Sequence, residues 1–475
     1  MLRRRRGRSE AGVTVADTGR WQRWCEAALS GRREDAVTLL SGLRAALDDG
    51  PPYDRAAALD ALTSAPAELL LLLDRHARPR SGGGAHRAAP PARGAVPAPA
   101  ADPLRLLLGS LDEDGRVRGA AVEGLTGVGG PLAVAALALR TVDWVPEVRE
   151  RATAALVARN APDEVAAAVR VLLRLDGRSR AGGLVAAYRT VLSDPPHRRA
   201  VRALAADTDP LARRFGVQLA LDLGSYVRGD LLRTALHDRD QVCRRLCAQR
   251  LLELDPDQAG RLMWARGAGV RELAVAALPG DVPATRLVPP LADRARMVRA
   301  QARWQLYRRG EPPADVYRKQ LRKVGRSTPP RLAAGLAAGL GECGDAADAP
   351  LLMRLLGPRE RDRAEPWPPM VRRAAVRAVG RLAKPADLVG LLGPLAADQD
   401  PGVAREVFEA LGRVPDDVPV ETLWIGRTRT EPAVRRAAER IGGRTYERTA
   451  PVGGAAAGRD LADVPRSSRG TVPGR

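Results

Sequence analysis

The densest group of cations in the sequence is the segment Tyr317-Arg-Lys-Gln-Leu-Arg-Lys-Val-Gly-Arg326. Residues four apart share one face of a helix, so a helix here aligns Arg318 with Arg322 and Lys319 with Lys323. Repulsion within such a stripe is relieved by phosphate or carboxylate groups, while the alternative is a solvated face without a ligand. The predicted binding surface consists of Tyr317, Arg318, Lys319, Arg322, Lys323 and Arg326.

Trp367 is a second candidate because it stands between prolines in Glu365-Pro-Trp-Pro-Pro369. The segment from Arg359 to Pro369 resembles a loop inserted between two repeats. We expect Trp367 to be exposed on this rigid loop, where a tryptophan can anchor an interface. Trp304, in contrast, falls within a predicted helix and is expected in the core.

The sequence indicates no metal site. Cys243 and Cys247 are four residues apart, and His237 lies six residues before them, but three ligands of this spacing match no zinc pattern. Both cysteines occupy the apolar face of a predicted helix, which places them in the core.

Catalytic and cofactor motifs are also not indicated. The other histidines, His76, His86 and His197, are far apart in the sequence, and no glycine-rich phosphate-binding motif stands between a strand and a helix. We therefore predict no catalytic residue and no cofactor.

The chain has 475 residues and a formal net charge of +21. Such a charge attracts nucleic acid, anionic lipid or acidic protein. Lysine occurs only at 319, 323 and 384, and the abundance of Arg, Ala, Gly and Pro is typical of a GC-rich genome. Whether the charge is functional or reflects this bias is left open by the sequence.

The cysteine and hydropathy patterns favour a cytoplasmic protein. Four scattered cysteines are too few for a disulfide framework. The basic residues that follow Met1 precede no apolar stretch of the kind a signal peptide needs, and no apolar run is long enough for a transmembrane helix.

Composition divides the chain into five segments. Residues 1–20 and 444–475 are predicted to be disordered tails, the first of them basic. Residues 21–76 form a small helical segment, and residues 77–101 are an Ala/Pro/Gly-rich linker. Residues 102–443 form a repeat array, and whether the segment 21–76 docks on it is left open.

One pattern recurs in this array at intervals of about 28 to 40 residues, which is typical of helical repeats. Val or Leu is often followed by Arg, then by a small or apolar residue four positions after the start and by Leu four positions later. Copies begin, for example, at Val117, Val148, Val270 and Val298. A first helix precedes each copy, so every repeat is a helical hairpin.

Helix-capping residues support the same boundaries. Asp stands three residues before several copies, at Asp114, Asp209, Asp240 and Asp400, where its carboxylate can cap a helix N-terminus. Pro follows at the first helical position of many copies, and Gly follows the apolar stretch. The segment from Pro279 to Pro290 departs from the pattern because it contains four prolines, so we expect a bend there.

These residues resemble the HEAT-repeat family, in particular its short bacterial form. The matching segments include Asp400-Pro-Gly-Val-Ala-Arg405 and Glu431-Pro-Ala-Val-Arg-Arg-Ala437. The resemblance implies an all-α fold, a right-handed α-solenoid of about 10–12 helical hairpins. It also implies that the recurring Arg and Asp connect neighbouring repeats rather than bind a ligand.

The resemblance further implies a non-catalytic scaffold or adaptor that binds a partner protein. The alternative is a nucleic-acid-binding protein that uses arginine-rich faces. A third reading is a HEAT-like DNA glycosylase, since Trp144 follows Asp143; no continuous motif supports it. The oligomeric state stays open.

Overall fold

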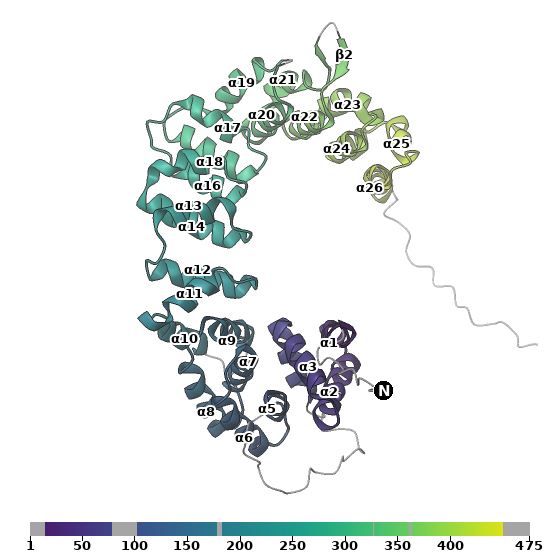
Figure 1. Ribbon diagram of the computed structural model, residues 1–475. Helices are drawn as coiled ribbons and strands as arrows, with labels where there is room; N and C mark the ends of the chain where they lie inside the picture. Colours follow the sequence, from purple (N-terminus) through teal and green to yellow (C-terminus); the bar gives the residue numbers. More distant parts are fainter. Residues whose placement is uncertain (1–14, 78–101, 178–182, 326, 361–362, 450–475) are drawn as a thin grey trace, which may run out of the picture. The chain divides into compact units, whose positions relative to one another are not determined.

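The computed structural model describes residues 15–77, 102–177, 183–325, 327–360 and 363–449. These residues form α-helices, with a few short 3-10 helices and one pair of short strands. The chain divides into two compact units, Met1–Gln258 and Ala259–Arg475. Successive helices pair as hairpins, and neighbouring hairpins stack within each unit (Figure 1). The predicted all-α solenoid class is confirmed.

Unit 1 begins with a four-helix segment. Its helices are α1 (Val15–Ala28), α2 (Arg33–Asp48), α3 (Pro52–Ser64) and α4 (Ala67–Ala77). Helix α1 therefore starts inside the stretch that the sequence analysis assigned to the N-terminal tail. The linker residues 78–101 lie outside the described residues.

This N-terminal segment docks on the repeat array that follows it. Helices α3 and α4 pack against α7, and α4 also packs against α9. Arg140 of the array forms an ion pair with Asp74, and both side chains are nearly fully buried. Arg174 Nε lies 2.6 Å from Glu68 Oε1. The docking that the sequence left open is thus built from apolar contacts and ion pairs.

The array of unit 1 continues through five hairpins. Their helices are α5 (Pro103–Ser110), α6 (Gly115–Thr126), α7 (Pro131–Arg140), α8 (Pro146–Val157), α9 (Pro162–Leu175), α10 (Leu184–Leu192), α11 (Arg198–Ala205), α12 (Pro210–Asp222), α13 (Arg228–His237) and α14 (Gln241–Leu254).

Unit 2 continues the alternation of first and second helices. Its helices are α15 (Ala259–Leu262), α16 (Ala268–Ala276), α17 (Val288–Leu291), α18 (Arg296–Tyr307), α19 (Pro313–Arg322), α20 (Pro330–Cys343), α21 (Ala349–Met353), α22 (Pro369–Leu382), α23 (Pro385–Leu392), α24 (Pro401–Leu411), α25 (Val420–Arg427) and α26 (Pro432–Thr449). Helix α26 extends beyond the predicted array boundary at 443.

The insertion between α21 and α22 forms a small antiparallel hairpin of β1 (Pro358–Glu360) and β2 (Arg363–Pro366). Pro358 pairs with Pro366 and Glu360 with Arg363. The sequence analysis expected an inserted loop at this place but no strands.

Aspartates cap the second helices as expected. The carboxylate of Asp114 accepts the amide of Arg116 at 2.8 Å, and that of Asp400 accepts the amide of Val403 at 2.9 Å. Asp209 and Asp240 cap α12 and α14 in the same way. These contacts satisfy amides that have no partner within the helix.

The recurring arginines connect successive repeats. Each of four arginines forms a two-point ion pair with the Asp in the loop before the next second helix: Arg118 with Asp143, Arg213 with Asp238, Arg271 with Asp293, and Arg372 with Asp398. In each pair, Nη1 of the arginine also donates to a backbone carbonyl in the loop that precedes the arginine's own helix. The planar guanidinium suits both tasks, and the predicted structural role of these arginines is confirmed.

In the described part of the chain, no single helix is both long and apolar enough to cross a membrane. Helices α3 and α4 meet that criterion only when taken together, and they are bent by 114° where they meet.

Candidate functional site

The predicted cationic surface on α19 is only partly present. Tyr317 is fully buried, and its hydroxyl donates a hydrogen bond to the carbonyl of Leu291 at 2.8 Å. Burial raises the pKa of Tyr317 above its ordinary value. The inclusion of Tyr317 in a binding surface is therefore wrong, because its ring packs in the core between hairpins.

Arg318 is held by carboxylates. Its Nε lies 2.7 Å from Asp348 Oδ1, its Nη1 2.7 Å from Asp315 Oδ1 and its Nη2 2.8 Å from Asp345 Oδ2. Hydrogen bonds, first to Asp348 and then to Asp315, raise the pKa of Arg318. A guanidinium with three acidic neighbours attracts no further anion, so Arg318 does not belong to a binding surface either.

Three of the remaining cations of this segment are exposed. Lys319, Arg322 and Lys323 lie on the surface, and Arg326 lies outside the described residues. Lys319 and Arg322 belong to the last turn of α19 and Lys323 follows it, where positive charge stabilises the helix C-terminus. Their position is thus explained without a ligand.

Trp367 is buried, with 2% of its surface exposed. The prediction of an exposed tryptophan is wrong because Trp367 does not lie on the strands of the insertion but between β2 and α22, where its side chain is buried. Its backbone carbonyl accepts a hydrogen bond from Arg372 Nη1 at 2.6 Å, so the repeat-connecting arginine fixes the end of the insertion.

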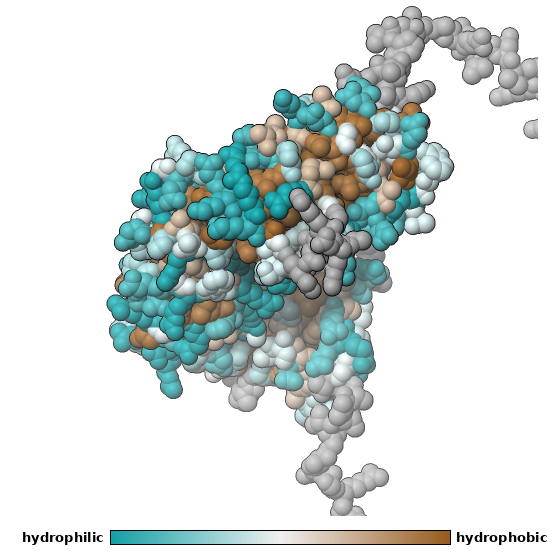
Figure 2. Space-filling view, turned by 90° about the horizontal axis from the view of Figure 1, so that it is seen from above, coloured by the Kyte–Doolittle hydropathy of each residue, from teal (hydrophilic) through white to brown (hydrophobic). Residues whose placement is uncertain are grey.

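Trp304, predicted in the core, is 53% exposed and stacks on Tyr307 with ring centroids 5.8 Å apart. Its position on α18 falls on the face opposite Val298 and Ala302, which are buried. Other exposed aromatic residues are Trp144, Trp264 and Trp424. Figure 2 shows exposed hydrophobic patches between hydrophilic residues on one face of the molecule.

The carboxylate of Asp143 is occupied by structural hydrogen bonds and ion pairs. Its carboxylate accepts Arg118 Nε and Nη2 and Arg140 Nη1, each at 2.9 Å, together with the amide of Val145 at 3.0 Å. Burial opposes its charge, but the hydrogen bonds from Arg118 and Val145 and the two guanidinium charges hold the pKa of Asp143 below its ordinary value. The pair of Asp143 and Trp144 therefore gives no support for a glycosylase.

Cys243 and Cys247 are buried on α14, as predicted. Burial raises the pKa of each thiol to about 12, so both are protonated at neutral pH and neither is a good metal ligand or nucleophile. Among the described residues, no group of three or more His, Cys, Asp or Glu side chains has the arrangement of a metal site.

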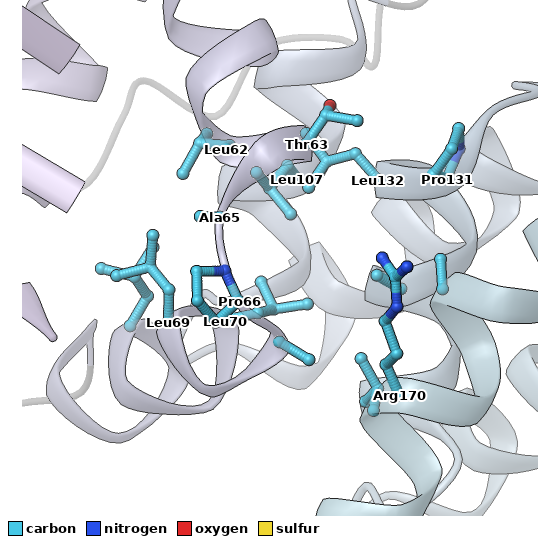
Figure 3. A pocket seen from close by; sticks show the side chains of 15 residues that line it. Leu62, Thr63, Ala65, Pro66, Leu69, Leu70, Leu107, Pro131, Leu132 and Arg170 are labelled. Carbon is cyan, nitrogen blue, oxygen red and sulfur yellow. The ribbon is translucent and has the colours of Figure 1, made fainter. Parts of the chain in front are cut away.

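Unit 1 contains a small apolar pocket where α3 and α4 meet α5, α7 and α9 (Figure 3). Leu62, Leu70, Leu107 and Leu132 line it, and its volume is only about 50 Å³. Arg170, at its margin, forms two-point contacts of 2.9–3.2 Å with Asp207. The pocket is a gap in the packing of the docked segment rather than a ligand site.

A larger groove occurs in unit 2, where the stacking of second helices opens. Helix α16 packs against α18, and α20, α22, α24 and α26 pack in succession, whereas α18 and α20 make no comparable contact. Their main direct connections are ion pairs from Arg299 and Arg303 to Glu342. We call the space of about 640 Å³ beside them the α18–α20 groove.

The break follows from the sequence before α18. The first helix of this hairpin, α17, has only four residues, two of which are Pro289 and Pro290. The loop after it lies directly on α20, since a Cβ on Gly335 would come within 1.9 Å of the carbonyl oxygen of Ala292. Only glycine admits this close approach of the loop to α20. The contact between the loop and α20 accompanies the open arrangement of α18 and α20.

The groove has an apolar base. Pro290, Ala292, Ala334 and Gly335 line it and are buried, and their small size leaves its volume open. Arg271 and Arg299 also line it, but both are buried and neutralised, the first by Asp293 and the second by Glu342.

The rim of the groove consists of the exposed lining residues Trp264, Arg266, Arg294, Arg331 and Met370. Within the described residues, the three rim arginines form no ion pair with a carboxylate, and Arg294 Nη2 makes only a 3.4 Å contact to the carbonyl of Arg266. An apolar base with a cationic and aromatic rim is able to bind a ligand that is partly apolar and partly anionic.

The sequence analysis predicted a bend at Pro279 to Pro290 but did not recognise the groove. The four prolines were the signal for the short first helix. The unpaired state of Arg266, Arg294 and Arg331 could not be read from the sequence, because the recurring arginines look alike until their carboxylate partners are known.

The stacked helical hairpins define an α-solenoid. Residues 361–441 match the family described as HEAT repeats. This part of the chain therefore carries HEAT repeats, as its sequence resemblance indicates. No sequence among the curated proteins matches it.

Solved structures of other solenoid proteins are similar to this chain at low identity. A karyopherin bound to the extreme C-terminus of a protein phosphatase has 12% identity and a TM-score of 0.34, with 92% of this chain and 55% of the karyopherin covered. This chain thus spans about half the length of that protein. A structure concerned with the interaction between cadherin and beta-catenin has 14% identity and a TM-score of 0.24, with 92% and 98% covered.

Proposed function

We propose that this protein is a non-catalytic scaffold that binds a partner protein on the surface of its repeats. The observation that carries the proposal is the α18–α20 groove, where exposed arginines without a carboxylate partner among the described residues border an apolar base. HEAT repeats present extended helical surfaces of this kind. The proposed location is the cytoplasm, which the cysteine content and the hydropathy of the sequence support.

The state of the arginines favours protein over nucleic acid as the partner. Many cations that give the chain its charge are already paired with carboxylates, as the repeat-connecting arginines are. Nucleic-acid binding needs a continuous row of free cations along the phosphate backbone. The exposed Lys319, Arg322 and Lys323 keep nucleic acid as the alternative, and they define the variant that tests it.

An affinity capture experiment tests this function. The purified chain is incubated with lysate of its source cell, with and without nuclease, at two salt concentrations. We expect recovery of a defined protein that is unaffected by nuclease. Recovery of nucleic acid that is lost at the higher salt concentration, and in the triple variant Lys319→Gln, Arg322→Gln and Lys323→Gln, would instead establish the alternative.

A further inference from the structure

We propose that the α18–α20 groove binds an acidic polypeptide segment of a partner protein, with an apolar side chain of that segment seated on the groove base. This inference rests on the proposed scaffold function and deepens it. It assigns the partner a chemistry, and it assigns the chain three specificity-determining residues, Arg266, Arg294 and Arg331.

The charge of the rim selects an anionic occupant. Three arginines near the groove have an acidic partner: Arg271 has Asp293, and Arg299 and Arg303 share Glu342. Arg266, Arg294 and Arg331 are exposed and, in the described part of the chain, have no such partner. Among the described residues, Asp293 is the single carboxylate that lines the groove, and Arg271 already holds it at 2.7 Å and 2.8 Å. Three positive charges are thus left for a ligand.

The N-terminus of α20 adds to this field. Arg331 is the second residue of the helix, and the residue before the helix, Pro329, provides no side-chain cap. The partial positive charge of a helix N-terminus favours carboxylates. A carboxylate near Arg331 would therefore meet both a guanidinium and the uncapped first turn.

The apolar part of the groove selects a polypeptide with a hydrophobic residue. Trp264 is 70% exposed and Met370 is 40% exposed, although each borders the apolar base. Binding is favoured when a ligand covers large apolar side chains, because their surface is removed from water. The groove volume of about 640 Å³ is large enough for one hydrophobic side chain of the segment, placed over the small base residues, while its acidic neighbours reach the rim.

The tails and linker of this chain have the wrong charge to occupy the groove. Residues 1–14 contain five arginines and one glutamate, residues 78–101 contain no acidic residue, and residues 450–475 contain four arginines and two aspartates. The charge of these segments therefore favours a segment of another protein as the occupant. A nucleic acid fits less well because three rim cations beside an apolar base make a local cluster and not a track.

The test is a binding titration with the full chain. The probe is a short fluorescein-labelled peptide of alternating Glu and Leu, followed by fluorescence anisotropy. The groove variant carries Arg266→Gln, Arg294→Gln and Arg331→Gln. The matched control carries Lys319→Gln, Arg322→Gln and Lys323→Gln, which removes the same charge from exposed positions on α19 that do not line the groove.

We expect the groove variant to bind the peptide about tenfold more weakly or worse, because it loses charge-assisted hydrogen bonds, and the control to change less than about twofold. Ala338 also lines the groove, so a third variant, Ala338→Phe, fills the groove without a change in charge and should weaken binding as well. Far-UV circular dichroism and thermal unfolding establish that each variant is folded.

Other outcomes overturn the proposal. Equal loss in the groove variant and the control would show diffuse attraction to net charge. Failure of the wild-type chain to bind the peptide, or tighter groove-dependent binding of a single-stranded oligonucleotide, would exclude an acidic polypeptide as the ligand. If the groove variant still captures the same defined protein from lysate, the scaffold function stands and the groove assignment fails; if wild type captures none, the scaffold function itself fails.

Discussion

Asp143→Asn tests whether the buried arginine connections hold the repeats together. The side chains of Arg118 and Asp143 are both fully buried, and Arg140, which also donates to Asp143, is 2% exposed. The substitution keeps the size of the side chain but removes the negative charge that two buried guanidinium groups face. Breaking a buried pair by neutralising one partner costs about 3–5 kcal/mol.

The expected cost is near the lower end of that range. Arg118 Nη1 retains the carbonyls of Asp112 and Glu113, and Arg140 retains Asp74, so neither cation becomes isolated. A loss of about 3 kcal/mol lowers the midpoint of thermal unfolding of a unit of this size by roughly 6–12 °C. Urea denaturation followed by circular dichroism measures the difference in free energy of unfolding.

The matched control is Glu123→Gln, which breaks the exposed pair between Arg151 and Glu123. These side chains are 49% and 70% exposed, so solvent screens the pair and its loss costs about 0–1 kcal/mol. The reasoning is refuted if Asp143→Asn is no more destabilising than this control.

The destabilisation caused by Asp143→Asn should depend on pH. The pKa of Asp143 is lowered in the folded state, so its stabilising contribution is fully present above the ordinary aspartate pKa of about 3.9 and is lost as the pH falls through the lower folded value. The difference in unfolding free energy between wild type and Asp143→Asn should therefore be constant near neutral pH and should shrink in acid.

Three further outcomes are expected. Gly335→Ala should destabilise unit 2 by about 1–3 kcal/mol in urea denaturation, because a Cβ there meets the carbonyl of Ala292, whereas Gly390→Ala on α23, with open space around it, should be neutral or stabilising by up to about 1 kcal/mol. Asp74→Ala should speed amide hydrogen exchange in α4 relative to α12, since it leaves Arg140 buried with one ion pair fewer; unchanged exchange would show that apolar contacts alone dock the segment. Cys243 and Cys247 should resist alkylation at pH 8 until the chain is denatured, and rapid labelling of the native protein would contradict their burial.

The fold could be predicted from the sequence because its determinants are local. The Asp caps, the first-position prolines and the spacing of apolar residues act within one helix, and each appears in the structure where the sequence indicates it. The role of the recurring arginines could also be inferred, since a periodic Arg and a periodic Asp recur together, as Arg372 and Asp398 do.

The candidate site could not be predicted in the same way because exposure and pairing depend on distant residues. Arg318 looked free in the sequence, but two of its three carboxylate partners, Asp345 and Asp348, lie in the next hairpin. Trp367 looked exposed because prolines flank it, but it follows the strands of the insertion, directly before α22, and its side chain is buried. Only the arrangement of hairpins shows which cations lack partners.

This distinction changes how the net charge of +21 should be understood. A buried, paired arginine such as Arg118 contributes little to the field that a ligand meets, because Asp143 cancels it at 2.9 Å. The attraction for anions therefore comes from exposed cations without a carboxylate partner, and the rim of the α18–α20 groove places three of these beside an apolar base. Since neutralising Lys319, Arg322 and Lys323 changes the net charge by as much as neutralising the rim, comparison of the two variants separates bulk charge from local arrangement. A genome-wide bias toward arginine would supply the rim cations, but it would not make them responsible for selective binding.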